Sequence, residues 1–245
     1  TLSHELRTPL NAMLGWTRLL RMGRLDRDAM NRALETIERN AHIQEQLIAD
    51  ILDVSRIVTG KLRLNLRPLD LSPIIDAAVD AVQPTADAKG IALHTQLEPS
   101  RSVLGDADRL QQVLWNLLAN AIKFTPRGGT VRVSVLRDDP NVEILVADTG
   151  QGIEPDFLPL VFERFRQADG GITRRPGGLG IGLAIVRNIV ELHGGEVRAE
   201  SRGSDRGATF RVRIPAHREV VGGGSASTFP PGAQPPRLDG VSVLL

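Results

Sequence analysis

The sequence of 245 residues contains no cysteine, and aromatic residues make up only 3% of it. Without cysteine the chain forms no disulfide, no thiolate zinc site and no thiol nucleophile. This absence is compatible with a reducing compartment, and we expect a cytoplasmic protein, although a full-length parent could be tethered to a membrane. No apolar run approaches the roughly 18 residues of a membrane span, and no basic-then-apolar leader starts the chain. We therefore expect no membrane contact in this fragment.

An excess of either charge is also missing. Thirty basic and 29 acidic residues nearly cancel, with a formal net charge of +1. No global field therefore attracts nucleic acid, which we do not expect as a partner, and any positive charge that matters must be local. The hydrophobic content of 41% is enough to fill a core.

The first 60 residues have helical periodicity. Apolar residues recur at helical spacing over 2–22, with Pro9 as the one interruption. After a break at 22–26, two neighbouring apolar stripes run to Gly60. A helix with two apolar stripes needs more than one partner, so residues 1–60 predict a helical hairpin that forms a homodimeric four-helix bundle.

Beyond Gly60 the pattern changes to mixed strands and helices over 61–217. The predicted strands are 61–66, 91–97, 130–136, 142–147, 196–201 and 208–214, and the predicted helices are 71–89, 106–124 and 181–192. This pattern indicates a two-layer α/β sandwich, so the whole chain is of the α+β class. Residues 218–237 have the Gly, Ser and Pro content of a flexible linker, and 238–245 regain strand character.

The Gly-rich stretch "GGLGIGLAIV" at 177–186 leads into the predicted helix 181–192. Such a turn can offer backbone N–H groups to phosphates, but glycines also mark ordinary turns. The stretch fits neither the dinucleotide-binding fingerprint, whose third glycine comes one place later, nor the P-loop, which needs Gly-Lys-Ser/Thr. It does not identify a ligand by itself.

Four other stretches accompany it. "NLLANAIKFTP" at 116–126 puts Asn116, Asn120 and Lys123 on one face of an apolar helix, where a polar line needs a ligand or water. "VADTGQGI" at 146–153 ends a strand in Asp148 beside two glycines. "VFERFRQAD" at 161–169 precedes a segment rich in Gly and Arg that is typical of a mobile lid, and "SHELRTPL" lies at 3–10.

In this order and spacing, the five stretches resemble the H, N, G1, F and G2 boxes of the sensor histidine kinases. The resemblance covers about residues 1–216. It implies a dimerisation and phosphotransfer hairpin followed by an ATP-binding domain of the Bergerat type, shared with type II topoisomerases, the Hsp90 chaperones and MutL. Residues 238–245 resemble the start of a receiver domain, which implies a hybrid kinase.

The resemblance also implies roles for single residues. Asp148 would accept a hydrogen bond from the adenine amino group of ATP, with Thr209 assisting, and Asn120 would bind Mg²⁺ through its side-chain oxygen. Lys123 and Arg164 would neutralise phosphate charge. The further nucleotide-binding residues implied are Asn116, Gly150, Gly152, Ile153, Gly178, Leu179, Gly180, Gly182 and Leu183.

One position separates a kinase from a hydrolase. Relatives that hydrolyse ATP have a glutamate at the position of Asn116, where it activates water. An amide has no basic lone pair at pH 7, so bound ATP should be protected from water and kept for another acceptor.

The resemblance makes His4 that acceptor. A neutral imidazole can attack the γ-phosphorus, and Glu5 is suited to take the remaining ring proton. Thr8, one helical turn further, would orient a water that removes the phosphoryl group from a response-regulator aspartate, which would be a phosphatase activity. His42, His94, His193 and His217 lie in no motif and are expected to be surface or core residues.

Two alternatives remain open. One is a hydrolysing ATPase of the same fold, which Asn116 disfavours. The other is a degenerate kinase that serves as a nucleotide-binding scaffold or acts mainly as a phosphatase, although every box is filled. The leading prediction is a histidine kinase whose partner is a receiver domain, in the same chain or in another.

Overall fold

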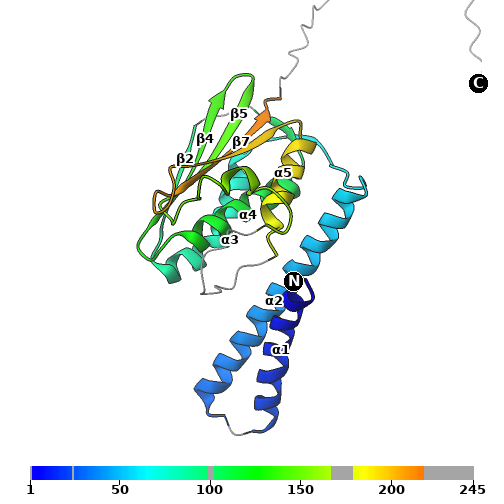
Figure 1. The fold of residues 1–245 in the computed structure, drawn as a ribbon, viewed down its shortest axis with the longest axis vertical. Coiled ribbons are helices and arrows are strands. Elements are labelled where there is room, and N and C mark those ends of the chain that lie inside the picture. The colour runs from blue at the N-terminus through cyan, green and yellow to red at the C-terminus, as the bar shows by residue number, and fades with distance from the viewer. Residues whose placement is uncertain (1, 24, 99–101, 167–178, 218–245) are drawn as a thin grey trace, which may run out of the picture.

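The computed structural model describes residues 2–23, 25–98, 102–166 and 179–217, apart from the side chains of Leu2 and His4. It shows a helical hairpin followed by a mixed α/β domain, which confirms the predicted α+β class (Figure 1). The elements are α1 (Leu2–Arg21), α2 (Arg27–Val58), β1 (Arg67–Leu69), α3 (Ser72–Lys89), β2 (Ala92–Leu97), β3 (Val103–Gly105), α4 (Ala107–Phe124), β4 (Thr130–Asp138), β5 (Asn141–Asp148), the 3₁₀ turn η1 (Leu158–Leu160), α5 (Gly182–Leu192), β6 (Glu196–Ser201) and β7 (Ala208–Pro215).

Helices α1 and α2 pack antiparallel over the first half of α2 (Figure 1). Helix α1 continues through the buried Pro9 rather than ending there. Asp26 starts α2 by accepting a hydrogen bond from the backbone N–H of Ala29 at 2.6 Å, which satisfies one donor of the first turn. The second half of α2 extends beyond the hairpin and runs beside the α/β domain (Figure 1).

A five-stranded sheet in the order β2-β4-β5-β7-β6 forms the second layer of the α/β domain. Strands β2 and β4 pair in parallel, and the other neighbours are antiparallel. Helices α3, α4 and α5 cover one face of this sheet (Figure 1). The alternating apolar side chains of the strands, such as Val133, Ile144 and Val212, are fully buried against these helices and form the core.

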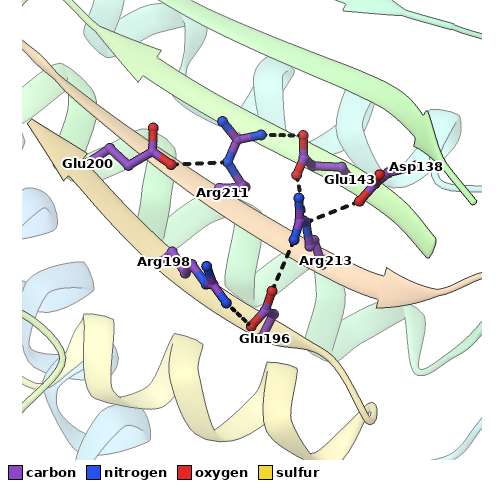
Figure 2. A network of polar contacts seen from close by, with 7 residues as sticks. All are labelled: Asp138, Glu143, Glu196, Arg198, Glu200, Arg211 and Arg213. Atoms are coloured by element: carbon purple, nitrogen blue, oxygen red, sulfur yellow. Dashed lines mark hydrogen bonds and ion pairs between the residues drawn. The ribbon is translucent and has the colours of Figure 1, made fainter. Parts of the chain in front are cut away.

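The opposite face of the sheet carries a network of charged side chains (Figure 2). Glu143 of β5 is only 4% exposed, and both its oxygens accept hydrogen bonds from Arg211 and Arg213 of β7. Arg213 also pairs with Asp138 and Glu196, so the network joins β4, β5, β7 and β6. These ion pairs fix the register of adjacent strands on the side that the helices do not cover.

One predicted strand is wrong. Residues 61–66 form no regular structure, and the strand β1 comes directly after them, where Arg67–Leu69 pairs antiparallel with Val103–Gly105 of β3. The alternation over 61–66 indicated a strand, but a strand needs a hydrogen-bonded neighbour, and the neighbour β3 faces the residues that follow. The predicted linker at 218–237 and strand at 238–245 lie outside the described residues.

Candidate functional site

Helix α4 brings the predicted polar stripe to the centre of the site. Its first turn is capped by Asp106, which accepts a hydrogen bond from the backbone N–H of Arg109 at 3.2 Å. Asn116 is buried, and its Nδ2 donates to the carbonyl oxygen of Gln112 at 3.0 Å. That bond turns Asn116 Oδ1 toward the start of α5, since a Cβ on Gly182 would be 2.8 Å from it.

Asp148 ends β5 as predicted, and its carboxylate is partly buried. Asp148 Oδ1 accepts hydrogen bonds from the backbone N–H of Gly150 at 2.8 Å and of Ala208 at 3.3 Å. Within the described residues Oδ2 accepts none, so it can accept one from a ligand. Burial raises the pKa of Asp148, and the two backbone hydrogen bonds oppose this shift.

The turn after Asp148 is held close to the end of α4. A Cβ on Gly150 would be 2.6 Å from the carbonyl oxygen of Phe124, and the N–H of Gln151 donates to that same oxygen at 3.2 Å. Gly152 has a φ of 71°, which a residue with a side chain rarely adopts. The partly buried Ile153 follows and packs against the core. The approach of this turn to α4 therefore needs Gly150, and its backbone conformation needs Gly152.

The segment before α5 adjoins the last described residues of the F box. The backbone N–H of Phe165 donates to the carbonyl oxygen of Gly180 at 2.9 Å. A Cβ on Gly180 would be 2.5 Å from the carbonyl oxygen of Arg166. Leu179 is buried, Leu183 is partly buried in the first turn of α5, and the neighbouring Arg164 is exposed. The predicted Gly178 lies outside the described residues.

A cavity of about 650 Å³ opens between the end of α4 and the turn after β5. It is lined by Lys123, Phe124 and Gly150, among others. The ammonium of Lys123 lies 5.0 Å from the centre of the Phe124 ring, an attractive cation–π arrangement. Phe124 thus lines a cavity beside two of the predicted residues, Lys123 and Gly150. The sequence offered a signal for it, because Phe124 follows Lys123 directly in the same motif.

Lys89 of α3 is a second residue that the sequence did not single out. Its ammonium donates to the carbonyl oxygens of Ile122 at 2.6 Å and of Lys123 at 2.8 Å. These are carbonyls of the last turn of α4, which have no partner within the helix. Lys89 and Ile122 are 33 positions apart, so no local pattern could have revealed this contact.

Thr209 is not brought to Asp148. Ala208 is the residue of β7 that pairs with Asp148, while Thr209 pairs with Ala147 of β5 and Glu200 of β6. Because successive side chains of a strand point to opposite faces, Thr209 lies on the face of the charged network rather than on that of Asp148. The adenine contact expected of Thr209 has no support in this geometry.

The amino end of α1 lies near the carboxyl end of α4. Lys123 as a whole residue is exposed, but burial of its ammonium lowers its pKa, and the negative charge of Glu5 partly opposes that shift. Glu5 is partly buried, Thr8 is exposed, and both lie on α1 together with the backbone of His4, whose side chain is outside the described atoms. The charge of Glu5, in the predicted acceptor turn, therefore acts on Lys123 at the predicted phosphate-binding end of α4.

The donors for a metal ion are few. Among the described residues, no group of three or more His, Asp or Glu side chains could hold one. The amide of Asn120 makes no hydrogen bond within the described part of the chain and offers one oxygen. This donor fits Mg²⁺ only if phosphate groups and water supply the remaining ligands, which is a usual arrangement for Mg²⁺ with nucleotides.

Two protein-family models match the chain. The first, described as "His Kinase A (phospho-acceptor) domain", matches residues 1–60. The second, described as "Histidine kinase-, DNA gyrase B-, and HSP90-like ATPase", matches residues 105–218.

Curated relatives are similar over most of the chain. Hybrid signal transduction histidine kinase D of Dictyostelium discoideum is 40% identical, over 87% of this chain and 17% of its own length. Histidine protein kinase DivJ of Caulobacter vibrioides is 40% identical, over 87% of this chain and 36% of its own length. The chain therefore spans well under half the length of these two relatives.

Solved structures show the same similarity. Full-length ShkA in complex with AMPPNP aligns with a TM-score of 0.66 and 34% identity, over 88% of this chain and 45% of that one. A mycobacterial sensor histidine kinase, MprB, aligns with a TM-score of 0.57 and 32% identity, over 62% of this chain and 99% of that one. None of the described helices is long and apolar enough to cross a bilayer.

Proposed function

The chain belongs to the sensor histidine kinases, and from this premise we propose that it uses ATP to phosphorylate His4 and passes the phosphoryl group to an aspartate of a receiver domain. The observation that carries the proposal is the polar stripe of α4, which lies against the start of α5: a Cβ on Gly182 would be 2.8 Å from Asn116 Oδ1. Lys123 ends the polar stripe of α4, and Glu5 follows His4 in α1. The negative charge of Glu5 acts on Lys123, where it partly opposes the lowering of the pKa of that lysine, so the acceptor turn is on the side of the site that would hold the phosphates.

ATP would bind with its adenine amino group donating to Asp148 and its phosphates beside Lys123 and Arg164. Glycines 150, 152, 178, 180 and 182 would allow the flanking turns to approach the nucleotide, with Ile153, Leu179 and Leu183 as apolar neighbours. Asn120 would hold Mg²⁺, which supplies neutralisation of phosphate charge when it is bound.

In the transfer step, a ring nitrogen of neutral His4 attacks the γ-phosphorus. The P–N bond forms as the bond from phosphorus to the bridging oxygen of ADP breaks, and Glu5 accepts the proton of the other ring nitrogen. The positive charge of Lys123 favours the negative charge that develops on the leaving phosphate oxygens. Helix α4 would also position the phosphates of ATP relative to the acceptor turn, because the residues proposed to bind phosphate and Mg²⁺ lie on this helix.

Transfer to His4 is favoured over hydrolysis. Asn116 is buried, and its amide donates to a backbone carbonyl, so it offers no base that would activate water. The hydrolysing ATPase is thus the weaker candidate. A phosphatase reaction is a second proposal for the same helix face, because Thr8 is exposed one helical turn beyond His4.

We further propose that the protein works as a homodimer. Apolar side chains on the two hairpin helices are 43% to 53% exposed in the single chain: Leu10, Leu14, Leu34, Ile43 and Ile48. A second hairpin would cover them in a four-helix bundle.

The proposal divides the chain into four parts. Residues 1–60 dimerise and carry the acceptor, 61–217 bind ATP, 218–237 form a linker and 238–245 begin a receiver domain.

The test is labelling with ATP that carries ³²P at the γ-position. We expect label on the protein that is labile in acid and stable in base, and its loss in His4→Gln. His42→Gln is the matched control, because His42 is an exposed histidine of the same hairpin outside the motif. Label that persists in His4→Gln would exclude His4 as the acceptor, and steady release of phosphate without any label would support the hydrolase instead.

A further inference from the structure

A buried carboxylate of the hairpin is bound by the ATP-binding domain. Asp53 of α2 is 5% exposed, and its Oδ2 accepts hydrogen bonds from Arg109 Nη1 at 2.7 Å and from Gln112 Nε2 at 2.8 Å. Arg109 Nη1 also donates to Gln112 Oε1 at 2.8 Å, which orients the two α4 side chains together. We call Asp53, Arg109 and Gln112 the α2–α4 clamp.

The clamp differs from an ordinary surface ion pair. Exposed pairs contribute little because water solvates both charges, but a buried charge that loses its partner remains without compensation. Asp53 is buried, and the side chain of Arg109 is 22% exposed. The more exposed Arg56 is 3.9 Å from Asp53 at its nearest, so it assists without replacing Arg109. Separation of α4 from α2 would therefore leave Asp53 poorly compensated.

Polar contacts join α2 and α4 at this point, in addition to apolar side chains of α2, such as Leu47 and Val54, that pack against the core. A cavity of about 550 Å³ lies between α2, α3 and α4, and Asp53, Arg109 and Trp115 are among the residues that line it. A second polar contact lies nearby, where the backbone N–H of Asn65, in the segment after α2, donates to Asp106 Oδ2 at 2.9 Å. Both contacts act on the amino end of α4.

Two members of the clamp, Arg109 and Gln112, lie on the same helix as Asn116, Asn120 and Lys123. Gln112 carries the carbonyl oxygen to which Asn116 donates. Lys123 lies fourteen residues beyond Arg109, about 21 Å along the helix, where the charge of Glu5 reaches it. Helix α4 thus meets α2 at one end and approaches α1 at the other, so the position of one end determines that of the other.

We propose that Asp53 is a positioning residue for the transfer to His4. Its pairing with Arg109 and Gln112 holds the amino end of α4 on α2, so that the carboxyl end, with Lys123, stays beside the turn of His4 and Glu5 of the same chain. This proposal rests on the proposed function. It assigns to Asp53 the alignment of two domains rather than a contact with nucleotide.

The experiment compares Asp53→Asn, Arg109→Gln and the double variant in the full chain. Two quantities are measured, the initial rate of His4 labelling at saturating ATP and the affinity for a fluorescent ATP analogue. We expect each single variant to label about tenfold more slowly or worse, with the nucleotide affinity within about twofold of the parent. The double variant should label no more slowly than the slower single variant, because both changes remove the same contact.

Asp50→Asn is the matched control. Asp50 lies on the same helix one turn earlier, and its carboxylate accepts a hydrogen bond from Gln46 of that same helix at 2.8 Å rather than from α4. The Asp50→Asn variant loses the same charge as Asp53→Asn, and its His4 should be labelled at the rate of the parent protein. A parent rate in both Asp53→Asn and Arg109→Gln, or a faster one, would overturn the positioning role.

Two further outcomes are decisive. A parallel loss of nucleotide affinity and labelling would show that these side chains support the folded site rather than the alignment, and would also overturn the proposal. Absence of label on the parent protein would instead refute the proposed function. The two failures are therefore distinguishable, because only the second affects the unmodified chain.

Discussion

Gly182 lies so close to Asn116 that a Cβ at its position would be 2.8 Å from Asn116 Oδ1. The two residues belong to different helices, α5 and α4, and are 66 positions apart. Their proximity explains why the start of α5 needs a glycine without any appeal to its backbone angles. It also joins two of the motifs into one site.

Gly182→Ala should therefore weaken nucleotide binding more than it weakens the fold. The added methyl group pushes against the end of a side chain, which can shift by a few tenths of an ångström, but the shifted Asn116 no longer fits the site. We expect about a tenfold loss of nucleotide affinity and a loss of about 1 kcal/mol in unfolding free energy. Titration with a fluorescent nucleotide measures the affinity, and urea denaturation measures the unfolding free energy.

Gly15→Ala is a suitable control for this change. Gly15 lies within α1, and a Cβ there would meet no atom within 4 Å. Alanine favours a helix by about 1 kcal/mol over glycine, so the control should be as stable as the parent or more stable, with unchanged nucleotide affinity. Equal affinity in Gly182→Ala and the parent would contradict the close contact.

Asp148 should make nucleotide binding sensitive to acid. Burial raises its pKa, so it takes up a proton at a higher pH than an ordinary aspartate does. Protonation turns an oxygen acceptor into a hydroxyl donor, and we expect nucleotide affinity to fall as the pH decreases through the raised pKa. Affinity measured from pH 7.5 to 4.5 checks this, and Asp148→Asn should show no such step.

The raised pKa of Asp148 affects the stability of the fold in the opposite direction from nucleotide binding. Because the folded protein holds the proton of Asp148 more tightly than the unfolded chain does, this group stabilises the fold at low pH, and that contribution is lost as the pH rises through the folded pKa. Asp148→Asn should thus unfold at the same temperature or a higher one at pH 7.5, yet bind nucleotide more weakly by about 1–3 kcal/mol. Asp76→Asn, an exposed change on α3, should alter neither property.

Much of the site was predictable because helical spacing is a local property. Asn116, Asn120 and Lys123 lie on α4 where the sequence predicted a polar stripe, and Asp148 ends its strand. The alternation of β7 also predicts which face of the sheet each of its residues lies on. Ala208, Phe210, Val212 and Ile214 form the apolar face of that strand, which places Thr209 on the other face.

Contacts between distant residues were not predictable. Asp53 and Arg109 are separated by 56 residues, and nothing in either local pattern selects the partner. The strand over 61–66 was wrongly predicted for a related reason, because alternation cannot say whether a neighbouring strand is present. The burial of Glu143 likewise depends on Arg211 and Arg213 of β7, which are distant from it in the sequence.

Glu143→Gln should destabilise the α/β domain. The change removes the negative charge that compensates Arg211 and Arg213, although both arginines remain partly exposed and so keep some solvation. We expect a loss of about 1–3 kcal/mol in unfolding free energy, below the cost for a fully buried pair. Urea denaturation measures it, and nucleotide affinity should stay unchanged because the network lies on the face opposite to Asp148.

Glu191→Gln is the comparison for that loss. Glu191 pairs with Arg187 one turn away on α5, and both side chains are more than half exposed. Such a pair contributes about 0.3–0.5 kcal/mol, so the control should differ little from the parent. If the two variants were equally stable, the buried network would have no special role.

Leu14→Asp and Leu34→Asp should weaken the proposed dimer. Both side chains are about half exposed on the hairpin, and an aspartate would have to lose its hydration in the bundle. We expect the dimer dissociation constant to rise at least tenfold in sedimentation experiments, with nucleotide affinity unchanged. Glu38→Gln, on the exposed surface of α2, is the control, and an unaltered dimer in all three variants would place the dimer interface elsewhere.

The lysine of α3 that binds the last carbonyls of α4 has an electrostatic consequence. The carboxyl end of a helix carries about half a negative charge, and here it lies next to the residue proposed to bind phosphate. A triphosphate near an uncompensated helix end would be repelled. Lys89, with its ammonium on the carbonyl oxygens of Ile122 and Lys123, cancels that repulsion before any nucleotide arrives. A triphosphate can then approach the carboxyl end of α4, although the carboxyl end of a helix normally repels anions.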